Sequence, residues 1–166
     1  MIITAVLLTK GMAGLNPLIG PNVQLFGDRF PPISNAYDLG LRLTAVECAQ
    51  EINLDIKEGV YVFVCGPSFE TRSEARYLQS FADCVGMSTV PEVVTAIHAG
   101  CRVLCLSLIT NKVAFLPVTR AIGFSHGEVV GNGNLASHQE VLETSSLKAS
   151  VFIELVKRVI SKIAVA

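Results

Sequence analysis

The sequence has few charged residues and no excess of either sign. Only 16% of the 166 residues are Asp, Glu, Lys or Arg, against about 25% in average soluble domains. The net charge is −1, so the basic surface of a nucleic-acid-binding protein is not expected. A chain with 51% apolar residues should cover much of its surface, either in a sheet buried on both faces or in an oligomer.

Long apolar runs and targeting signals are also missing. No run reaches the roughly 18 residues that a membrane-spanning helix needs, and the opening MIITAVLL lacks the basic segment of a signal peptide. The sequence contains no Asn-x-Ser/Thr sequon. These absences predict a cytoplasmic protein that does not bind a membrane.

Cysteines are present, but not in a pattern that predicts disulfides or metal binding. Their number is odd, no Cys-x-x-Cys occurs, and several lie in apolar runs. We expect buried, reduced thiols. The cysteines and histidines lack metal-ligand spacing, so no metal site is expected. The cysteines are Cys48, Cys65, Cys84, Cys101 and Cys105.

The order of helices and strands is predicted from hydrophobic periodicity and from the Gly, Pro and Asn residues that mark turns and loops between them. The length fits one domain over 1–166, which would bury about 70% of its unfolded surface. No repeat or linker divides the chain. Strands are predicted at 3–8, 59–65 and 102–110, helices at 36–52, 71–82, 90–99 and 138–165, and loops at 11–32 and 112–136.

Three of the predicted helices begin with the same signature, a hydroxyl residue followed three positions later by Glu. Such capping boxes satisfy unpaired backbone N–H groups at a helix start. The pairs are Thr71 with Glu74, Thr89 with Glu92, and Ser137 with Glu140. The strand at 102–110 is a continuous apolar run, which is typical of a strand buried on both faces.

Strands that alternate with helices predict an α/β fold with a mixed, largely parallel sheet and flanking helices. Ligand sites in such folds lie at the carboxyl ends of the strands. Four polar residues fall near strand ends or helix starts: Glu70, Ser88, Asn111 and His138. Each also has a simpler interpretation, as a solvated loop acid, a helix cap, a turn residue or an exposed side chain.

Other catalytic or cofactor motifs are absent or out of context. No Gly-x-Ser-x-Gly elbow occurs. Gly131-x-Gly133-x-x-Ala136 matches a dinucleotide fingerprint in form. It follows no convincing strand and lies in a long loop, so we do not interpret it as a cofactor site.

Three segments together carry a family resemblance: GPSFET, VGMSTVPE and SLITNK. With GLNPLIGPN and FGDRFPPISNAYD near the start, they resemble the homotrimeric purine nucleoside phosphorylases that act on 6-oxopurine nucleosides. The resemblance runs from about residue 14 to the end and implies a nucleoside phosphorylase-like fold. Methylthioadenosine phosphorylases, a sister family, generally replace the acid and the amide of the base pocket, so Glu70 and Asn111 favour the 6-oxopurine class.

The resemblance implies a purine pocket with two catalytic side chains. Glu70 would accept hydrogen bonds from N1–H and from the 2-amino group of guanine, and Asn111 would bond N7 and O6. Both would favour the transition state as the leaving purine gains negative charge. Phe69 would pack on the base or sugar, and Thr110 and Val113 would line the base pocket.

The resemblance also implies sites for the sugar and for phosphate. Tyr61 and the backbone of Met87 would hold ribose hydroxyls, and His138 would reach the 5′-hydroxyl. Ser88 would donate to phosphate. The helix start at 89–92 would add N–H groups and the positive end of a helix dipole, which suit an anion.

The implied activity is reversible phosphorolysis of inosine- or guanosine-type nucleosides to free purine and ribose 1-phosphate, in purine salvage. No cofactor is implied, because phosphate is a co-substrate, and the family forms trimers. The family's chains are longer at the N-terminus, where they carry a Gly/Ser phosphate loop and an Arg and a His that hold phosphate. The sequence therefore resembles the C-terminal half, apparently truncated at the N-terminus, with a longer loop at 114–137.

Three functional hypotheses follow. The chain is a purine nucleoside phosphorylase; or it is a catalytically impaired fragment that binds purines or modulates an oligomer; or it transfers the glycosyl group to another acceptor, as a nucleoside hydrolase does to water. The purine-pocket residues favour the first hypothesis, and the missing phosphate-binding segments favour the second.

Overall fold

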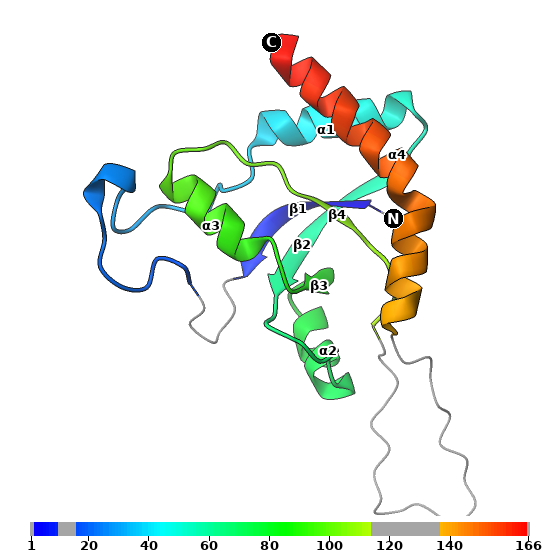
Figure 1. The fold of residues 1–166 in the computed structure, drawn as a ribbon, viewed down its shortest axis with the longest axis horizontal. Helices are drawn as coiled ribbons and strands as arrows, with labels where there is room; N and C mark the ends of the chain where they lie inside the picture. Colours follow the sequence, from blue (N-terminus) through cyan, green and yellow to red (C-terminus); the bar gives the residue numbers. More distant parts are fainter. Residues whose placement is uncertain (1, 10–15, 114–136, 166) are drawn as a thin grey trace, which may run out of the picture.

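The computed structural model describes residues 2–9, 16–113 and 137–165 (Figure 1). Its sheet contains β1 (Ile2–Thr9), β2 (Ile56–Phe63), β3 (Cys84–Gly86) and β4 (Leu106–Leu108), in the order β3-β2-β1-β4. β1 pairs parallel with β2, and β2 pairs parallel with β3, whereas β4 runs antiparallel to β1. The prediction of an α/β fold with a mixed, largely parallel sheet is confirmed.

Four α-helices flank the sheet: α1 (Leu39–Glu51), α2 (Arg72–Gln79), α3 (Val90–His98) and α4 (His138–Val165), with a short 3-10 helix at Gln24–Phe26. Figure 1 shows α1 beside α4, whereas α3 lies nearer the carboxyl end of β1. Their buried residues form two clusters, one between α1 and α4 and one that joins α3 to β2. The second cluster supports the candidate site: Ala36, Tyr37, Tyr61, Val90, Val93 and Val94.

Two strand predictions need correction. The run at 102–110 is a strand only at Leu106–Leu108, and its residues are half-buried rather than buried on both faces. β4 lies at an edge of the described sheet, which explains the partial exposure. β3 was not predicted, because three residues, Cys84–Gly86, are too few to show a strand periodicity.

The helix predicted at 36–52 begins at Leu39, because Asp38 is its N-cap. The Asp38 carboxylate accepts a hydrogen bond from the Leu41 N–H at 2.9 Å. It also forms two hydrogen bonds with Arg102, at 2.8 and 2.9 Å. Ala36 and Tyr37 precede the helix and are buried in the core beside α3.

The capping boxes have different outcomes. Thr71 and Glu74 form the reciprocal box, so that prediction is confirmed. The box at Thr89 is wrong, because Thr89 has φ +79° and its side chain makes no capping hydrogen bond. At α4, the Glu140 N–H donates to the Ser137 hydroxyl at 3.2 Å, which is one half of the expected box.

The cysteines are thiols, but the expectation that they are buried is wrong for most of them. Cys48 is buried, Cys84 and Cys105 are half-buried, and Cys65 and Cys101 are exposed. Burial, Cys105 and Asp83 raise the pKa of Cys84 to about 11, so it stays protonated at neutral pH. No helix in the described part of the chain is both long and apolar enough to cross a membrane.

Candidate functional site

The loops that follow β2 and β3 meet at one edge of the sheet. Phe63 pairs with Gly86 at the ends of the two strands, and the Val64 N–H donates to the Gly86 carbonyl at 2.9 Å. Gly66 then packs directly against Met87: a Cβ at Gly66 would lie 2.0 Å from the Met87 sulfur. With φ +58°, Gly66 also adopts a conformation that suits glycine.

This contact brings together two of the predicted substrate-binding segments. Phe69 is 49% exposed and Met87 is 60% exposed, so both large apolar side chains are open to solvent at this edge. Glu70 follows Phe69 and is half-buried. An acidic residue next to an exposed aromatic side chain, in a loop that contacts Met87, is suited to a flat ligand with apolar faces and polar edges.

Ser88 is hydrogen-bonded to the hydroxyl of Tyr61, a residue of the core. The Ser88 N–H donates to the Tyr61 hydroxyl at 3.3 Å, and the two hydroxyl oxygens lie 3.4 Å apart. Tyr61 is only 4% exposed, whereas Ser88 is exposed. The predicted sugar-binding residue Tyr61 thus lies inside the core, with its hydroxyl bonded to the predicted phosphate ligand.

The turn into α3 places a second hydroxyl beside Ser88. The hydroxyls of Ser88 and Thr89 lie 3.2 Å apart. Thr89 has φ +79°, which is rare for a β-branched residue. Strained residues of this kind persist where the surrounding structure holds them, and they cluster at functional sites.

The α3 N-terminus has fewer available amides than the sequence suggested. The Val90 N–H donates to the Ser88 carbonyl at 2.9 Å, and Pro91 has no N–H. Two positions of the first turn are therefore unavailable to an anion. A cavity of about 420 Å³ lies beside this turn; the residues that line it are Ser88, Thr89, Glu92, Val93, Ala96, Val103, Leu104, Cys105 and Leu106.

The antiparallel direction of β4 changes the position of its carboxyl end. Leu108 lies opposite Ile2, which lies opposite Ile56 at the start of β2. The expectation that strand carboxyl ends share one edge therefore holds for β2 and β3 but not for β4. The chain beyond β4 nevertheless approaches the other strands, because Val113 lines a cavity of about 240 Å³ together with Val62, Cys84 and Val85.

Asn111 and Thr110 form a pair beyond β4. The Thr110 hydroxyl donates to the Asn111 amide oxygen at 2.9 Å, and both residues are half-buried. His138 is the first residue of α4 and is exposed. The predicted contact of His138 with the sugar 5′-hydroxyl stays a prediction. The long loop before it, including the GNGN segment, lies outside the described residues.

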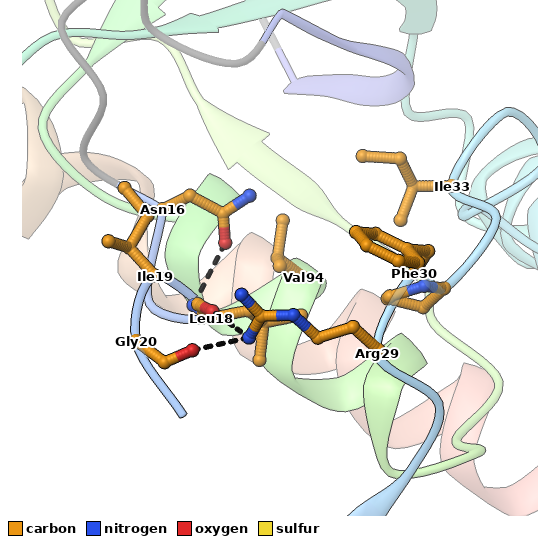
Figure 2. Close-up of a pocket in the computed structure, with 9 residues that line it drawn as sticks. Asn16, Leu18, Ile19, Gly20, Arg29, Phe30, Ile33 and Val94 are labelled. Carbon is orange, nitrogen blue, oxygen red and sulfur yellow. Dashed lines mark hydrogen bonds between the residues drawn. The ribbon is translucent and has the colours of Figure 1, made fainter. Parts of the chain in front are cut away.

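A third cavity lies away from the predicted residues (Figure 2). The Arg29 guanidinium donates to the carbonyls of Leu18 and Gly20 and lies 5.8 Å from the centre of the Phe30 ring. Figure 2 shows this arrangement closing one side of a cavity of about 320 Å³. The sequence segments that form it were recognised, but no residue of it was predicted to bind a ligand.

Residues 1–161 match the sequence profile of the phosphorylase superfamily. The chain belongs to the phosphorylase superfamily. This assignment confirms the resemblance that the GPSFET, VGMSTVPE and SLITNK segments indicated.

Within the described residues, no group of three or more His, Cys, Asp or Glu side chains could hold a metal ion.

Individual phosphorylases match most of this chain. It is 43% identical over 150 residues to purine nucleoside phosphorylase 1 of Bacillus subtilis, covering 90% of the chain and 50% of that protein. The crystal structure of the Schistosoma mansoni purine nucleoside phosphorylase in complex with adenosine has a TM-score of 0.83 at 36% identity, covering 97% of this chain and 55% of the other. The complex of the Schistosoma mansoni enzyme with inosine has a TM-score of 0.81 at 38% identity, over 97% and 53%. The chain thus spans about half the length of the relatives it matches.

Proposed function

We propose that this phosphorylase-superfamily chain carries the purine-binding part, and one phosphate-binding element, of a purine nucleoside phosphorylase. The reaction would be reversible phosphorolysis of 6-oxopurine nucleosides to purine and ribose 1-phosphate. The observation that carries the proposal is the contact between Gly66 and Met87, because it joins the Glu70 loop to the Met87-Ser88 turn. Purine and phosphate groups would then bind at one edge of the sheet.

Glu70 and Asn111 have the polar groups that a 6-oxopurine requires. Asn111 follows β4, whose carboxyl end lies at the other edge, but Val113, two residues later, lines a cavity with Val62 of β2 and Val85 of β3, so we propose that both side chains reach one purine. An ionised Glu70 accepts hydrogen bonds only, so it suits the N1–H of hypoxanthine or guanine. Thr110 already donates to the Asn111 amide oxygen at 2.9 Å, which leaves the amide NH₂ to donate to N7 and O6. Both interactions strengthen as the purine gains negative charge, which favours the transition state.

In the proposed reaction, a phosphate oxygen attacks C1′ while the bond from C1′ to the purine nitrogen breaks. The electron pair of that bond leaves with the purine, where Asn111 and Glu70 stabilise the charge. The Ser88 hydroxyl would donate a hydrogen bond to phosphate, and Met87 and His138 would contact the sugar. No cofactor takes part, because phosphate is the second substrate.

The test is a comparison of base binding by isothermal titration calorimetry. Hypoxanthine and guanine should bind more tightly than adenine, because adenine has no N1–H and carries an amino group in place of O6. Glu70→Gln should weaken guanine binding about 10- to 100-fold, since hydrogen bonds to charged groups contribute roughly 1.5–3 kcal/mol. Equal affinity for adenine would contradict the proposed base pocket.

A second candidate function is purine binding without turnover. It is favoured by the two positions of the α3 start that cannot donate to an anion: the Val90 N–H is already bonded to the Ser88 carbonyl, and Pro91 has no N–H. Purine binding combined with no phosphate-dependent release of hypoxanthine from inosine would select this candidate. Trimer formation is a further proposal, supported by the family resemblance. A cytoplasmic location is another, supported by the cysteine pattern of the sequence.

A further inference from the structure

We infer that Tyr61 is a positioning residue that orients the Ser88 hydroxyl toward a bound oxyanion, rather than a contact of the sugar. The inference rests on the proposed phosphate role of Ser88. Tyr61 is buried, with 4% of its surface exposed. Ser88, in contrast, is exposed to solvent and lines the cavity at the start of α3. The buried Tyr61 hydroxyl is hydrogen-bonded to Ser88, so it can act on a ligand through Ser88.

The strand register explains how the phenol reaches Ser88. Tyr61 on β2 pairs with Cys84 on β3, and Ser88 follows two residues after the end of β3. Between them lies Gly86, where a Cβ would be 2.2 Å from the Tyr61 hydroxyl. The absence of a side chain at Gly86 therefore leaves the space that the Tyr61 hydroxyl occupies.

The hydrogen bonds set the direction in which Ser88 donates. The Tyr61 oxygen accepts the Ser88 N–H at 3.3 Å. Its own proton can then be donated to the Ser88 hydroxyl oxygen, 3.4 Å away. The Ser88 hydroxyl oxygen also pairs with the Thr89 hydroxyl, 3.2 Å away. When Tyr61 and Thr89 both donate to it, Ser88 keeps its own hydroxyl proton, and an oxyanion in the adjoining cavity is the acceptor that such a chain of donors favours.

Tyr37 provides a matched control. It belongs to the same buried cluster as Tyr61 and is 5% exposed. Its hydroxyl has no hydrogen-bond partner among the described residues. Tyr37→Phe and Tyr61→Phe thus remove the same atom from the same core, but only the second change removes a bond to Ser88.

The experiment is a titration of the ¹⁵N-serine-labelled chain with inorganic phosphate, followed by NMR. The Ser88 amide signal is identified by its loss in Ser88→Ala. Without phosphate, Tyr61→Phe should shift that signal and Tyr37→Phe should not. With phosphate, Tyr61→Phe should weaken binding about 3- to 10-fold, while Tyr37→Phe should leave the affinity unchanged.

The double variant separates positioning from a general effect on stability. If Tyr61 acts through Ser88, Tyr61→Phe should cause no further loss of affinity in the Ser88→Ala background. Additive losses, or an unshifted Ser88 amide in Tyr61→Phe, would overturn the inference. A wild-type chain that does not respond to phosphate would overturn both the phosphate role of Ser88 and the role of Tyr61 toward an anion. The Ser88 amide shift would still report separately on their hydrogen bond.

Discussion

The charge state of Asp38 is tied to the fold. Hydrogen bonds from Arg102 and from the Leu41 N–H hold the pKa of its carboxyl well below the ordinary value. A carboxylate with a lowered folded-state pKa stabilises the fold above its unfolded pKa of about 4, and this stabilisation is lost as the pH falls further.

Asp38→Asn separates the charge of Asp38 from its capping role, because Asn caps helices about as well as Asp. We expect the variant to unfold more easily than the wild type at pH 7. Below about pH 4 the difference should shrink, since the Asp38 carboxyl becomes protonated in the unfolded wild type while the folded protein still holds it ionised. Urea unfolding at several pH values checks this, and a difference that does not depend on pH would contradict the assignment.

Thr110 tests the orientation of the Asn111 amide. Thr110→Val keeps the side-chain shape but removes the hydroxyl that donates to the Asn111 oxygen at 2.9 Å. One neutral hydrogen bond contributes about 0.5–1.5 kcal/mol, so hypoxanthine should bind about 2- to 10-fold more weakly. Thr110→Ser retains the hydroxyl and serves as the control. Equal affinities for all three proteins in calorimetry would exclude this positioning role.

At the scale of elements, α2 depends on its cap because it has only eight residues. The Thr71 hydroxyl accepts the Glu74 N–H at 3.2 Å, and the Glu74 carboxylate accepts the Thr71 N–H at 2.8 Å. Thr71→Ala should lower the free energy of unfolding by about 1 kcal/mol. Thr71→Ser should retain most of the stability, and the two variants would be compared by urea denaturation. A loss as large in the serine variant would show that the methyl group, not the cap, is responsible.

The pairing of β2 with β3 depends on the missing side chain at Gly86. Gly86→Ala would place a methyl group 2.2 Å from the Tyr61 hydroxyl, and overpacking of this kind typically costs about 1–3 kcal/mol. In the Tyr61→Phe background the closest remaining ring atom would be 3.1 Å away, so the cost should fall. Thermal unfolding of the four proteins measures this coupling, and equal costs in both backgrounds would contradict the predicted clash.

At the scale of the whole molecule, many large apolar side chains of the described residues are exposed. Exposed apolar groups on this scale favour association, so we expect the purified chain to be poorly soluble or to assemble. The exposed apolar side chains include those of Ile19, Leu25, Phe26, Phe30, Leu147 and Ile160.

The same chain, assayed alone, should be nearly inactive with inosine and phosphate. The family resemblance implies two or three further phosphate donors in a complete enzyme. Each charge-assisted donor contributes about 1.5–3 kcal/mol, so turnover should be lower by about two to six orders of magnitude. The assay would be run at saturating phosphate beside a complete relative, with the assembly sized by light scattering. A monodisperse monomer with turnover within about tenfold of the relative would contradict both expectations.

The sequence alone predicted much of this molecule. The order of helices and the largely parallel sheet follow from local periodicity, and the box at Thr71 follows from a four-residue pattern. The family was predicted from three motifs and confirmed by the match over residues 1–161. These features depend on neighbours in the chain or on the spacing of sequence motifs, so they can be predicted from the sequence alone.

Only the tertiary structure decided the direction of β4, the conformation of Thr89 and the partner of the Tyr61 hydroxyl. Strand direction depends on pairing with β1, which lies about a hundred positions earlier in the sequence. The φ of +79° at Thr89 replaces a cap that its sequence favoured. Tyr61 meets Ser88, 27 positions away, because Gly86 leaves space between two paired strands. Contacts between segments distant in sequence set these features, and local patterns carry no information about such contacts.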